Sequence, residues 1–302
     1  MQDYLSKLNE KYPIRRKKEQ KEEFFNYVCE NFEPNRVKKD VLDKNENIVI
    51  GNWEKADVII TAHYDTPASS IFPNVMMPRN IILSYAYHLG IPILMALVCL
   101  AFAFFISAVF KLEYIFTVYI YLVLYFGLFY FGMRFFVNKH NYNDNTSGVA
   151  TVMELAKLIN SEKVAFILFD NEEKGLVGSK AMAKKYKEQL SVKLVINLDC
   201  VANGKEILFI VKKGVEECKE YSLLKQSFNK TDEFTPHFFP FKGSSSNSDH
   251  KSFDRSIGVM ACSKGKFAKF VTGKIHTEKD VLVDKNNITY LVDAFVNFLQ
   301  KI

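Results

Sequence analysis

Short, solid apolar runs recur along most of the chain, and amphipathic stretches separate them. Runs of this kind, rich in Val, Ile, Leu and Phe, are typical of strands buried on both faces of a sheet. They predict strands at 57–62, 163–169, 193–198, 206–212 and 257–261, and strand-like segments also occur at 36–42 and 47–52. Apolar residues at helical spacing predict helices at 17–32, 146–160, 176–188, 217–228 and 288–299. The alternation predicts the α/β class, with a mixed central sheet sandwiched by helices.

One part of the chain breaks this pattern. No Asp, Glu, Lys or Arg occurs from 80 to 110 or from 114 to 133, and the short turn Lys111–Glu113 separates the two stretches. Each stretch is long enough to cross a hydrocarbon core, which takes about 20 residues. The pattern favours a two-helix transmembrane hairpin over a hydrophobic lid or a dimerisation arm. We therefore expect one α/β domain divided into 1–79 and 137–302, with the hairpin inserted at 80–136.

Composition narrows the classes of function. The chain has 40 Lys and Arg against 34 Asp and Glu, a net charge of +6, and the basic residues are scattered without a recognition motif. This argues against nucleic acid as a partner. Five Cys without paired spacing suggest reduced thiols, and the polar first 23 residues carry no secretory signal. The basic run Arg15–Lys18 is expected to be the solvated start of the first helix.

Acidic residues and histidines follow several of the predicted strands. The strand at 163–169 leads into an acidic loop, and similar groups follow two other strands, precede the helix near Ser147 and occur late in the chain. Ligand sites in open α/β sheets lie outside the carboxyl ends of the strands. Two His and three acids at such positions would suit a pair of zinc ions. All the His and acidic residues singled out at these positions, two His and five acids, are in chain order His63, Asp65, Asp144, Glu172, Glu173, Asp199 and His276.

These segments resemble, in order and local context, the signature of the di-zinc aminopeptidase family. That family includes bacterial leucine aminopeptidases, and its relatives are glutamate carboxypeptidases, glutaminyl cyclases and the transferrin-receptor ectodomain. The motifs are His63–Pro67, Asn143–Gly148, Asp170–Glu173, Asp199 and Ile275–Asp280, and the match runs from about 15 to 300 apart from the insert. The resemblance implies a zinc-exopeptidase fold, two Zn²⁺ or other divalent ions, and peptide substrates.

The resemblance also implies a role for each residue. Asp144 would bridge the two metals, and a cis peptide bond would follow it. Glu172 would be the general acid/base, and Asp65 would orient the ring of His63. Asp249 and His250 would line the substrate side, where Ser245 replaces a Tyr that serves some members as an oxyanion helper. The other metal ligands would be Glu173 and His276 at one site, and His63 and Asp199 at the other.

The flanks of the insert predict its orientation. Both flanks belong to one domain, so they lie on one side of the membrane. Arg79, Arg134 and Lys139 are on that side, against Lys111 at the far turn. The positive-inside rule then favours a cell-membrane protein with two spans and a catalytic domain that faces the cytoplasm.

The predicted function is that of a membrane-anchored aminopeptidase that removes N-terminal residues from peptides. A glutaminyl cyclase-like transferase is an alternative, but cyclases tend to lose the Asn-x-Ser-Gly pattern that Asn145–Gly148 keeps. A non-catalytic, peptidase-like binding module is another, but such relatives lose metal ligands that this chain keeps. Side-chain preference and oligomeric state stay open.

Overall fold

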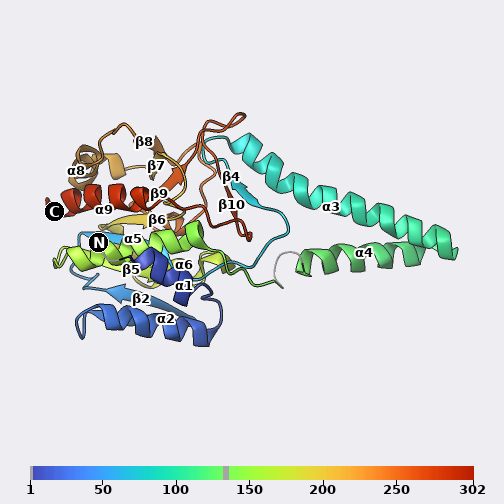
Figure 1. The fold of residues 1–302 in the computed structure, drawn as a ribbon, viewed down its shortest axis with the longest axis horizontal. Helices are drawn as coiled ribbons and strands as arrows, with labels where there is room; N and C mark the ends of the chain where they lie inside the picture. Colours follow the sequence, from blue (N-terminus) through green and yellow to red (C-terminus); the bar gives the residue numbers. More distant parts are fainter. Residues whose placement is uncertain (1–2, 132–135) are drawn as a thin grey trace.

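A computed structural model describes residues 3–131 and 136–302 of the chain. Its centre is an eight-stranded mixed sheet in the order β1-β2-β5-β3-β6-β9-β7-β8, with helices on both faces (Figure 1). The α/β prediction is therefore confirmed. The strands are β1 (Val37–Leu42), β2 (Asn45–Ile50), β3 (Val58–His63), β5 (Val164–Phe169), β6 (Leu194–Leu198), β7 (Glu206–Val211), β8 (Thr235–Pro240) and β9 (Ser256–Cys262).

The middle of the sheet is parallel. β3 pairs in parallel with β5 and with β6, and β6 pairs in parallel with β9. Every residue of β3, β5 and β6 is buried, which explains why these strands are continuous apolar runs rather than alternating ones. Since β3 and β5 are in register at His63 and Phe169, the polar residues that follow them emerge at the same edge.

The helices cover the two faces unequally. One core cluster joins the sheet to α1, α2, α5, α8 and α9, and a second, smaller cluster joins the opposite face to α6 and α7. The helices are α1 (Tyr4–Lys11), α2 (Lys18–Asn31), α5 (Gly148–Leu158), α6 (Val177–Lys185), α7 (Lys187–Ser191), α8 (Lys219–Ser227) and α9 (Lys285–Leu299).

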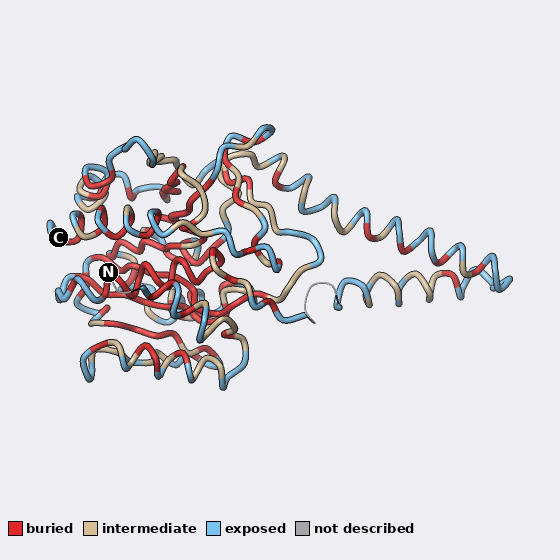
Figure 2. The backbone as a smooth tube through the Cα atoms, in the orientation of Figure 1, coloured by how far each residue is buried: buried red, intermediate tan, exposed pale blue. Residues whose placement is uncertain are grey.

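Two long apolar helices project from the domain at the edge where the parallel strands end (Figure 1). They are α3 (Ile81–Phe110) and α4 (Tyr114–Tyr130). Met95, Cys99, Ala103 and Ser107 of α3 are buried at four-residue spacing. The hydroxyl of Thr117 in α4 donates to that of Ser107 over 2.7 Å. Most other side chains of the pair are exposed or half-buried (Figure 2).

In the part of the chain that the structure describes, α3 is long and apolar enough to cross a membrane. The apolar helix α4 has 17 residues, fewer than the roughly 20 that a hydrocarbon core takes. Arg134, which the sequence analysis uses for orientation, lies outside the described residues. A small two-stranded sheet of β4 (Asn74–Met76) and β10 (Thr272–Ile275) lies near the base of α3.

Candidate metal centre

The residues that the sequence predicts as a site converge at the carboxyl edge of the parallel strands. His63 is the last residue of β3, and Asp199 directly follows β6. Glu172 and Glu173 open a 3₁₀ turn, η3 (Glu172–Lys174), just after β5. The remaining two, Asp144 and His276, come from a short π-helical turn, η2 (Tyr142–Ser147), and from the end of β10.

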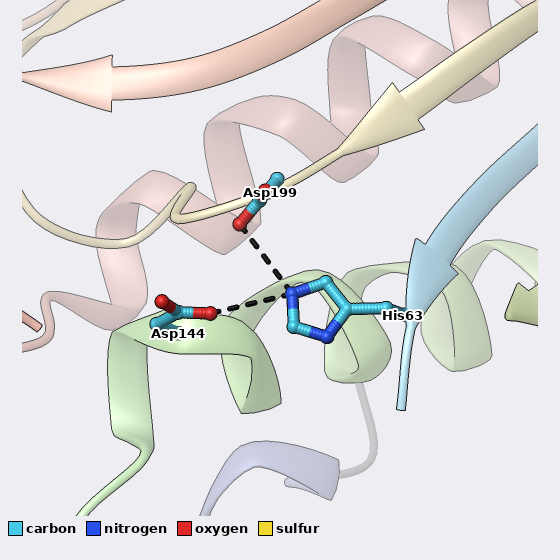
Figure 3. Close-up of side chains that lie close together, drawn as sticks. All are labelled: His63, Asp144 and Asp199. Atoms are coloured by element: carbon cyan, nitrogen blue, oxygen red, sulfur yellow. Dashed lines mark ion pairs between the residues drawn. The ribbon is translucent and has the colours of Figure 1, made fainter. Parts of the chain in front are cut away.

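His63 lies between two carboxylates (Figure 3). Its Nε2 is 3.3 Å from Oδ1 of Asp144 and 3.7 Å from Oδ1 of Asp199. On the other side of the ring, Nδ1 is 3.2 Å from the backbone oxygen of Asp65 and 3.6 Å from its Oδ1. An Nδ1–H that donates to Asp65 leaves the Nε2 lone pair directed at the two carboxylates, as in a metal-ligating histidine.

The second oxygen of Asp144 faces a different histidine. Oδ2 lies 2.9 Å from Nε2 of His276, which is also 3.5 Å from Oε1 of Glu173. His63, Asp144 and Asp199 thus form one group of potential ligands, and Asp144, Glu173 and His276 form another. Each oxygen of Asp144 belongs to one group, which is the arrangement of a bridging carboxylate.

The donor set fits two zinc ions. Ligand atoms about 2.0–2.1 Å from a tetrahedral Zn²⁺ lie about 3.3 Å apart, close to the separations within each group. Oε1 of Glu173 and Oδ1 of Asp199 are buried and accept no hydrogen bond from the described residues. Buried carboxylate oxygens of this kind require a positive partner. Mixed His and carboxylate ligands are typical of zinc and also accept other divalent ions.

The protonation equilibria point to the same need for positive charge. Burial raises the pKa of Glu173 to about 8, with a contribution from the negative charge of Asp144. Burial lowers the pKa of His276, but the carboxylates of Glu173 and Asp144 outweigh it and raise that pKa to about 9. Because the carboxylates are crowded, Glu173 and His276 keep protons at a higher pH than usual. Two bound cations would supply the positive charge in place of those protons.

Glu172 forms a further group of potential ligands with His63 and Glu173, whose ligand atoms lie within 4.8 Å of one another, but it makes no ion pair with a histidine among the described residues. Burial, together with the charges of Glu173, Asp249 and Asp199, raises the pKa of its carboxyl well above the usual range, against the lowering influence of His63. A carboxyl with a raised pKa beside a metal cluster can accept and return a proton near neutral pH.

Asp65 fixes the turn that carries both glutamates. Its Oδ1 accepts the backbone N–H of Glu172 over 3.0 Å, and its Oδ2 accepts that of Glu173 over 3.2 Å. Asp65 thus positions the acidic turn as well as the ring of His63, and the first of these contacts was not predicted.

Asp280 supports Asp144 from behind. Its carboxylate accepts the backbone N–H groups of Asn143 and Asp144 over 3.1 and 3.0 Å. The peptide bond between Asp144 and Asn145 is cis, as the family resemblance implies. The side-chain oxygen of Asn145 then accepts the N–H of Gly148 at the start of α5.

Arg15 is the functional neighbour that the sequence analysis places wrongly. It is expected in a solvated basic run, but its side chain is fully buried. The guanidinium donates to the backbone oxygens of Tyr12 and Tyr64 and to the hydroxyl of Thr146, and its backbone N–H donates to Thr66. It therefore ties the N-terminal segment to the loop after His63 and to the turn of Asp144. One arginine in a basic run gives no sequence signal for this.

The residues expected on the substrate side lie deeper than predicted. Asp249 and His250 are 0% and 1% exposed, so they are enclosed rather than lining an open surface. Burial raises the pKa of Asp249 to about 7 and lowers that of His250 to about 3. Ser245 bonds to the backbone of Met77 and Pro78, near the start of α3.

A cavity of about 1210 Å³ opens beside the metal cluster. Asp65, Glu173 and His276 line one part of it, and the opposite part is formed by residues at the base of the two apolar helices. Those residues are His88, Ile91, Pro92 and Met95 of α3, and Phe129 and Tyr130 of α4. The apolar helices therefore contribute to the wall of the candidate substrate site.

The fold and the cluster together define an α/β protein with a candidate zinc centre at the carboxyl ends of its parallel strands. The pattern of peptidase family M28 matches residues 137–298, more than half of the chain, and the chain belongs to this family.

Individual relatives are more distant. A "Probable zinc metalloprotease" of Pyrenophora tritici-repentis is 39% identical over 67 residues, which cover 20% of this chain and only 15% of that relative. The solved LapA aminopeptidase of Legionella pneumophila is 16% identical with a TM-score of 0.56, covering 98% of this chain and 69% of that one. A glutaminyl cyclase of Porphyromonas gingivalis is 12% identical with a TM-score of 0.58, covering 99% and 96%. At these identities the two structures establish the fold alone.

Proposed function

We propose that this chain is a membrane-anchored, zinc-dependent aminopeptidase with two metal ions. One observation carries the metal assignment: the two oxygens of Asp144 face His63 at 3.3 Å and His276 at 2.9 Å. On this proposal His63 and Asp199 complete one site, and Glu173 and His276 complete the other. Membership of peptidase family M28 supports hydrolysis of peptides.

The proposed reaction uses few protein groups. Zinc, when bound, polarises a scissile carbonyl and lowers the pKa of a water molecule. Glu172 accepts the proton of the attacking water and then delivers it to the departing amine. Asp65 holds the Glu172–Glu173 turn and the ring of His63 in place during both transfers.

Selection for an N-terminus follows from the charge of the cluster. A free α-amine is positively charged, and the carboxylates around the two groups of ligands attract it. An acylated N-terminus lacks that charge and adds bulk at the same place. We therefore assign exopeptidase rather than endopeptidase action.

The substrate is proposed to be a peptide of several residues that reaches the membrane surface. The cavity of about 1210 Å³ exceeds the roughly 300–1,000 Å³ of a typical small-molecule site. Since Ile91, Met95 and Phe129 line it, apolar residues downstream of the N-terminus would contact the helices.

Membrane anchoring rests on the exposure of α3. Only 22% of its most apolar 18-residue window is buried, whereas a core helix would be mostly buried. Exposed apolar surface on this scale requires a partner, and a bilayer is the simplest one. We propose that α3 and α4 form a two-span hairpin with the domain in the cytoplasm, because Arg79 and Lys139 flank it against Lys111 at the turn.

The decisive experiment combines metal content with a substrate panel. Protein purified in detergent should contain two zinc ions per chain and should release amino acids from aminoacyl-amides and short peptides. N-acetylated versions of the same peptides should be resistant. A cyclase would instead release ammonia and form pyroglutamate from peptides that begin with Gln, and a binding module would do neither.

A separate measurement tests the anchor. After lysis without detergent, the protein should be recovered with the membranes and should resist extraction by salt or high pH. Recovery in the soluble fraction would contradict the hairpin without affecting the proposed chemistry.

A further inference from the structure

A second surface near the base of α3 carries several positive charges. The segment 263–271, here called the basic loop, connects β9 to β10. Lys264, Lys266 and Lys269 lie in it, Lys274 follows in β10, and no Asp or Glu occurs from 263 to 277. Lys264 pairs with Glu206 of β7 over 3.3 Å. At its tip Phe267 is 89% exposed.

The basic loop has a defined conformation that directs this phenylalanine outward. A bridge joins Ser263 to Val271, and the N–H of Gly265 donates to the oxygen of Ala268 over 3.1 Å, which closes a tight turn. Phe270 is buried at the base of the turn. Phe267 is therefore exposed because the backbone turn and the burial of Phe270 hold it there.

The basic loop and the beginning of α3 enclose a cavity of about 880 Å³. Met77, Leu83 and Tyr87 line one side, and Lys266, Phe267 and Lys274 are among the residues on the other. An apolar interior with a lysine rim is complementary to a molecule that has both an anionic group and hydrocarbon.

The length of α3 places this cavity at the level of lipid headgroups. Its 30 residues extend about 45 Å, but a hydrocarbon core is only about 30 Å thick. Counting back about 20 residues from the turn at Lys111 leaves the first turns, 81–90, outside the hydrocarbon on the side of the domain. Leu83 and Tyr87, and with them the basic loop, then lie in the interfacial layer, where Tyr and Phe are favoured.

We propose that the basic loop and this cavity bind anionic phospholipid of the bilayer in which the hairpin is embedded. The lysines contact headgroup phosphates, Phe267 enters the interfacial layer, and the apolar lining of the cavity accommodates the glycerol and upper acyl chain. The inference rests on the proposed membrane anchoring and adds a lipid preference to it. Docking at this point would fix the tilt of the domain and thereby the position of the catalytic cavity relative to the membrane surface.

The test places a fluorescent reporter at the loop tip. Phe267→Trp is reconstituted into vesicles that carry a nitroxide quencher on a fraction of the headgroups, with either phosphatidylcholine alone or added phosphatidylglycerol. The parent protein gives the baseline, because its single tryptophan, Trp53, is buried and precedes β3 at the other edge of the sheet. Val192→Trp is the matched control, since Val192 is 67% exposed and precedes β6. It lies at the amino ends of the parallel strands, away from the carboxyl ends where the apolar helices project.

The fluorescence of the tryptophan in Phe267→Trp should be quenched strongly in the anionic vesicles and weakly in the neutral ones. The fluorescence of Val192→Trp should be quenched in neither. Adding Lys264→Gln, Lys266→Gln and Lys269→Gln should reduce the anionic signal to the neutral level, with about a fivefold loss in the docking equilibrium constant per lysine. Equal quenching in both lipids would overturn the anionic preference. No quenching at position 267 in protein that co-sediments with vesicles would overturn the docking while leaving the anchor intact. Peptidase activity on a soluble aminoacyl-amide is measured in parallel, so loss of the proposed function is seen separately.

Discussion

Glu172 and Glu173 are adjacent in one 3₁₀ turn, and Asp65 accepts the backbone N–H of both. Their side chains nevertheless have different neighbours. Glu173 lies 3.5 Å from His276 within one group of potential metal ligands. Glu172 makes no ion pair with a histidine in the described chain, although it belongs with His63 and Glu173 to a further group of potential ligands. This difference supports the proposed division of roles, in which Glu173 binds metal and Glu172 transfers the proton.

Glu172→Gln should lower kcat by about 10²- to 10⁴-fold, because the amide cannot accept a proton from the attacking water. Zinc content should stay at the parental level, because Glu173 and the other proposed ligands are unchanged. Steady-state kinetics and metal analysis on the same preparation check this. The control is Glu217→Gln, an exposed glutamate on the surface of the domain. Near-parental turnover in a metal-replete Glu172→Gln protein would refute the general-base assignment.

Asp144→Asn should remove more metal than His63→Ala. Each oxygen of Asp144 faces a different group of ligands, so weakening it affects both ions, whereas His63 belongs to one side of the pair. We expect less than one zinc per chain for Asp144→Asn and about one for His63→Ala, measured after gel filtration. Equal losses would argue against a bridging role for Asp144.

At the scale of elements, the site depends on an arginine that joins three segments. Arg15 contacts the backbone of Tyr64, next to His63, and the side chain of Thr146, next to the Asp144–Asn145 peptide. Burial lowers its pKa to about 10, so it still carries its charge at neutral pH. The N-terminal segment is thereby attached to both loops that carry candidate metal ligands.

Arg15→Lys should lower the free energy of unfolding by roughly 2–4 kcal/mol, because one ammonium cannot reach acceptors on three segments and leaves buried groups unsatisfied. Chemical denaturation in a fixed detergent measures this. Lys18→Gln, an exposed change on the same N-terminal segment, is the control and should be within about 0.5 kcal/mol of the parent. A stable Arg15→Lys protein would mean that the segments hold together without the arginine.

The sequence predicts helices and strands best where several consecutive residues are buried, because such segments form recognisable apolar runs. The strands β3, β5, β6 and β7 are buried at every residue and mostly apolar, so their positions are predicted to within one residue. By contrast, β8 (Thr235–Pro240) has only half-buried side chains and a proline at its end, and it was missed. The predicted helix at 176–188 is divided into α6 and α7 at Tyr186, whose ring packs on Trp53 from a distant part of the chain. Such long-range contacts leave no local pattern.

For the candidate site, the sequence motifs identify seven His and acidic residues, and the structure places all seven close together. They are His63, Asp65, Asp144, Glu172, Glu173, Asp199 and His276. The contacts that orient these residues could not be predicted from the sequence. The backbone N–H groups of the acidic turn donate to Asp65, which is 107 and 108 positions away in the chain. Asp249 and His250 were expected to line the substrate side of the site, and both are buried in the structure. A sequence motif identifies a residue but does not indicate how deeply its side chain is buried. Arg15 was missed for the same reason.

At the scale of the whole molecule, the two apolar helices are packed on each other but leave most of their surface exposed. Cys99 is on the buried seam of α3, and Leu112 is in the turn between the helices. The proposed hairpin therefore makes opposite predictions for these two positions.

In intact cells a membrane-impermeant thiol reagent should label Leu112→Cys from outside and leave Cys99 unmodified. The background for this test is a Cys99-only protein, with the other four cysteines changed to Ser or Ala. Lys18→Cys, on the domain, is the matched control and should react only after lysis. Labelling of position 112 only after lysis would exclude the proposed orientation.

The place of the hairpin in the chain also affects how the protein is made. His63 is synthesised before α3, whereas the other proposed metal ligands follow α4. Its strand, β3, pairs with β5 and β6, which are also synthesised later. While the ribosome delivers the apolar helices, the first 79 residues can therefore form only the β1–β2 hairpin, and β3 has no neighbouring strand to pair with. If the helices enter the bilayer at that stage, the catalytic centre is completed only afterwards and beside the membrane. Hydrolytic activity would then appear at its site of use, with free peptides in the cytosol spared during synthesis.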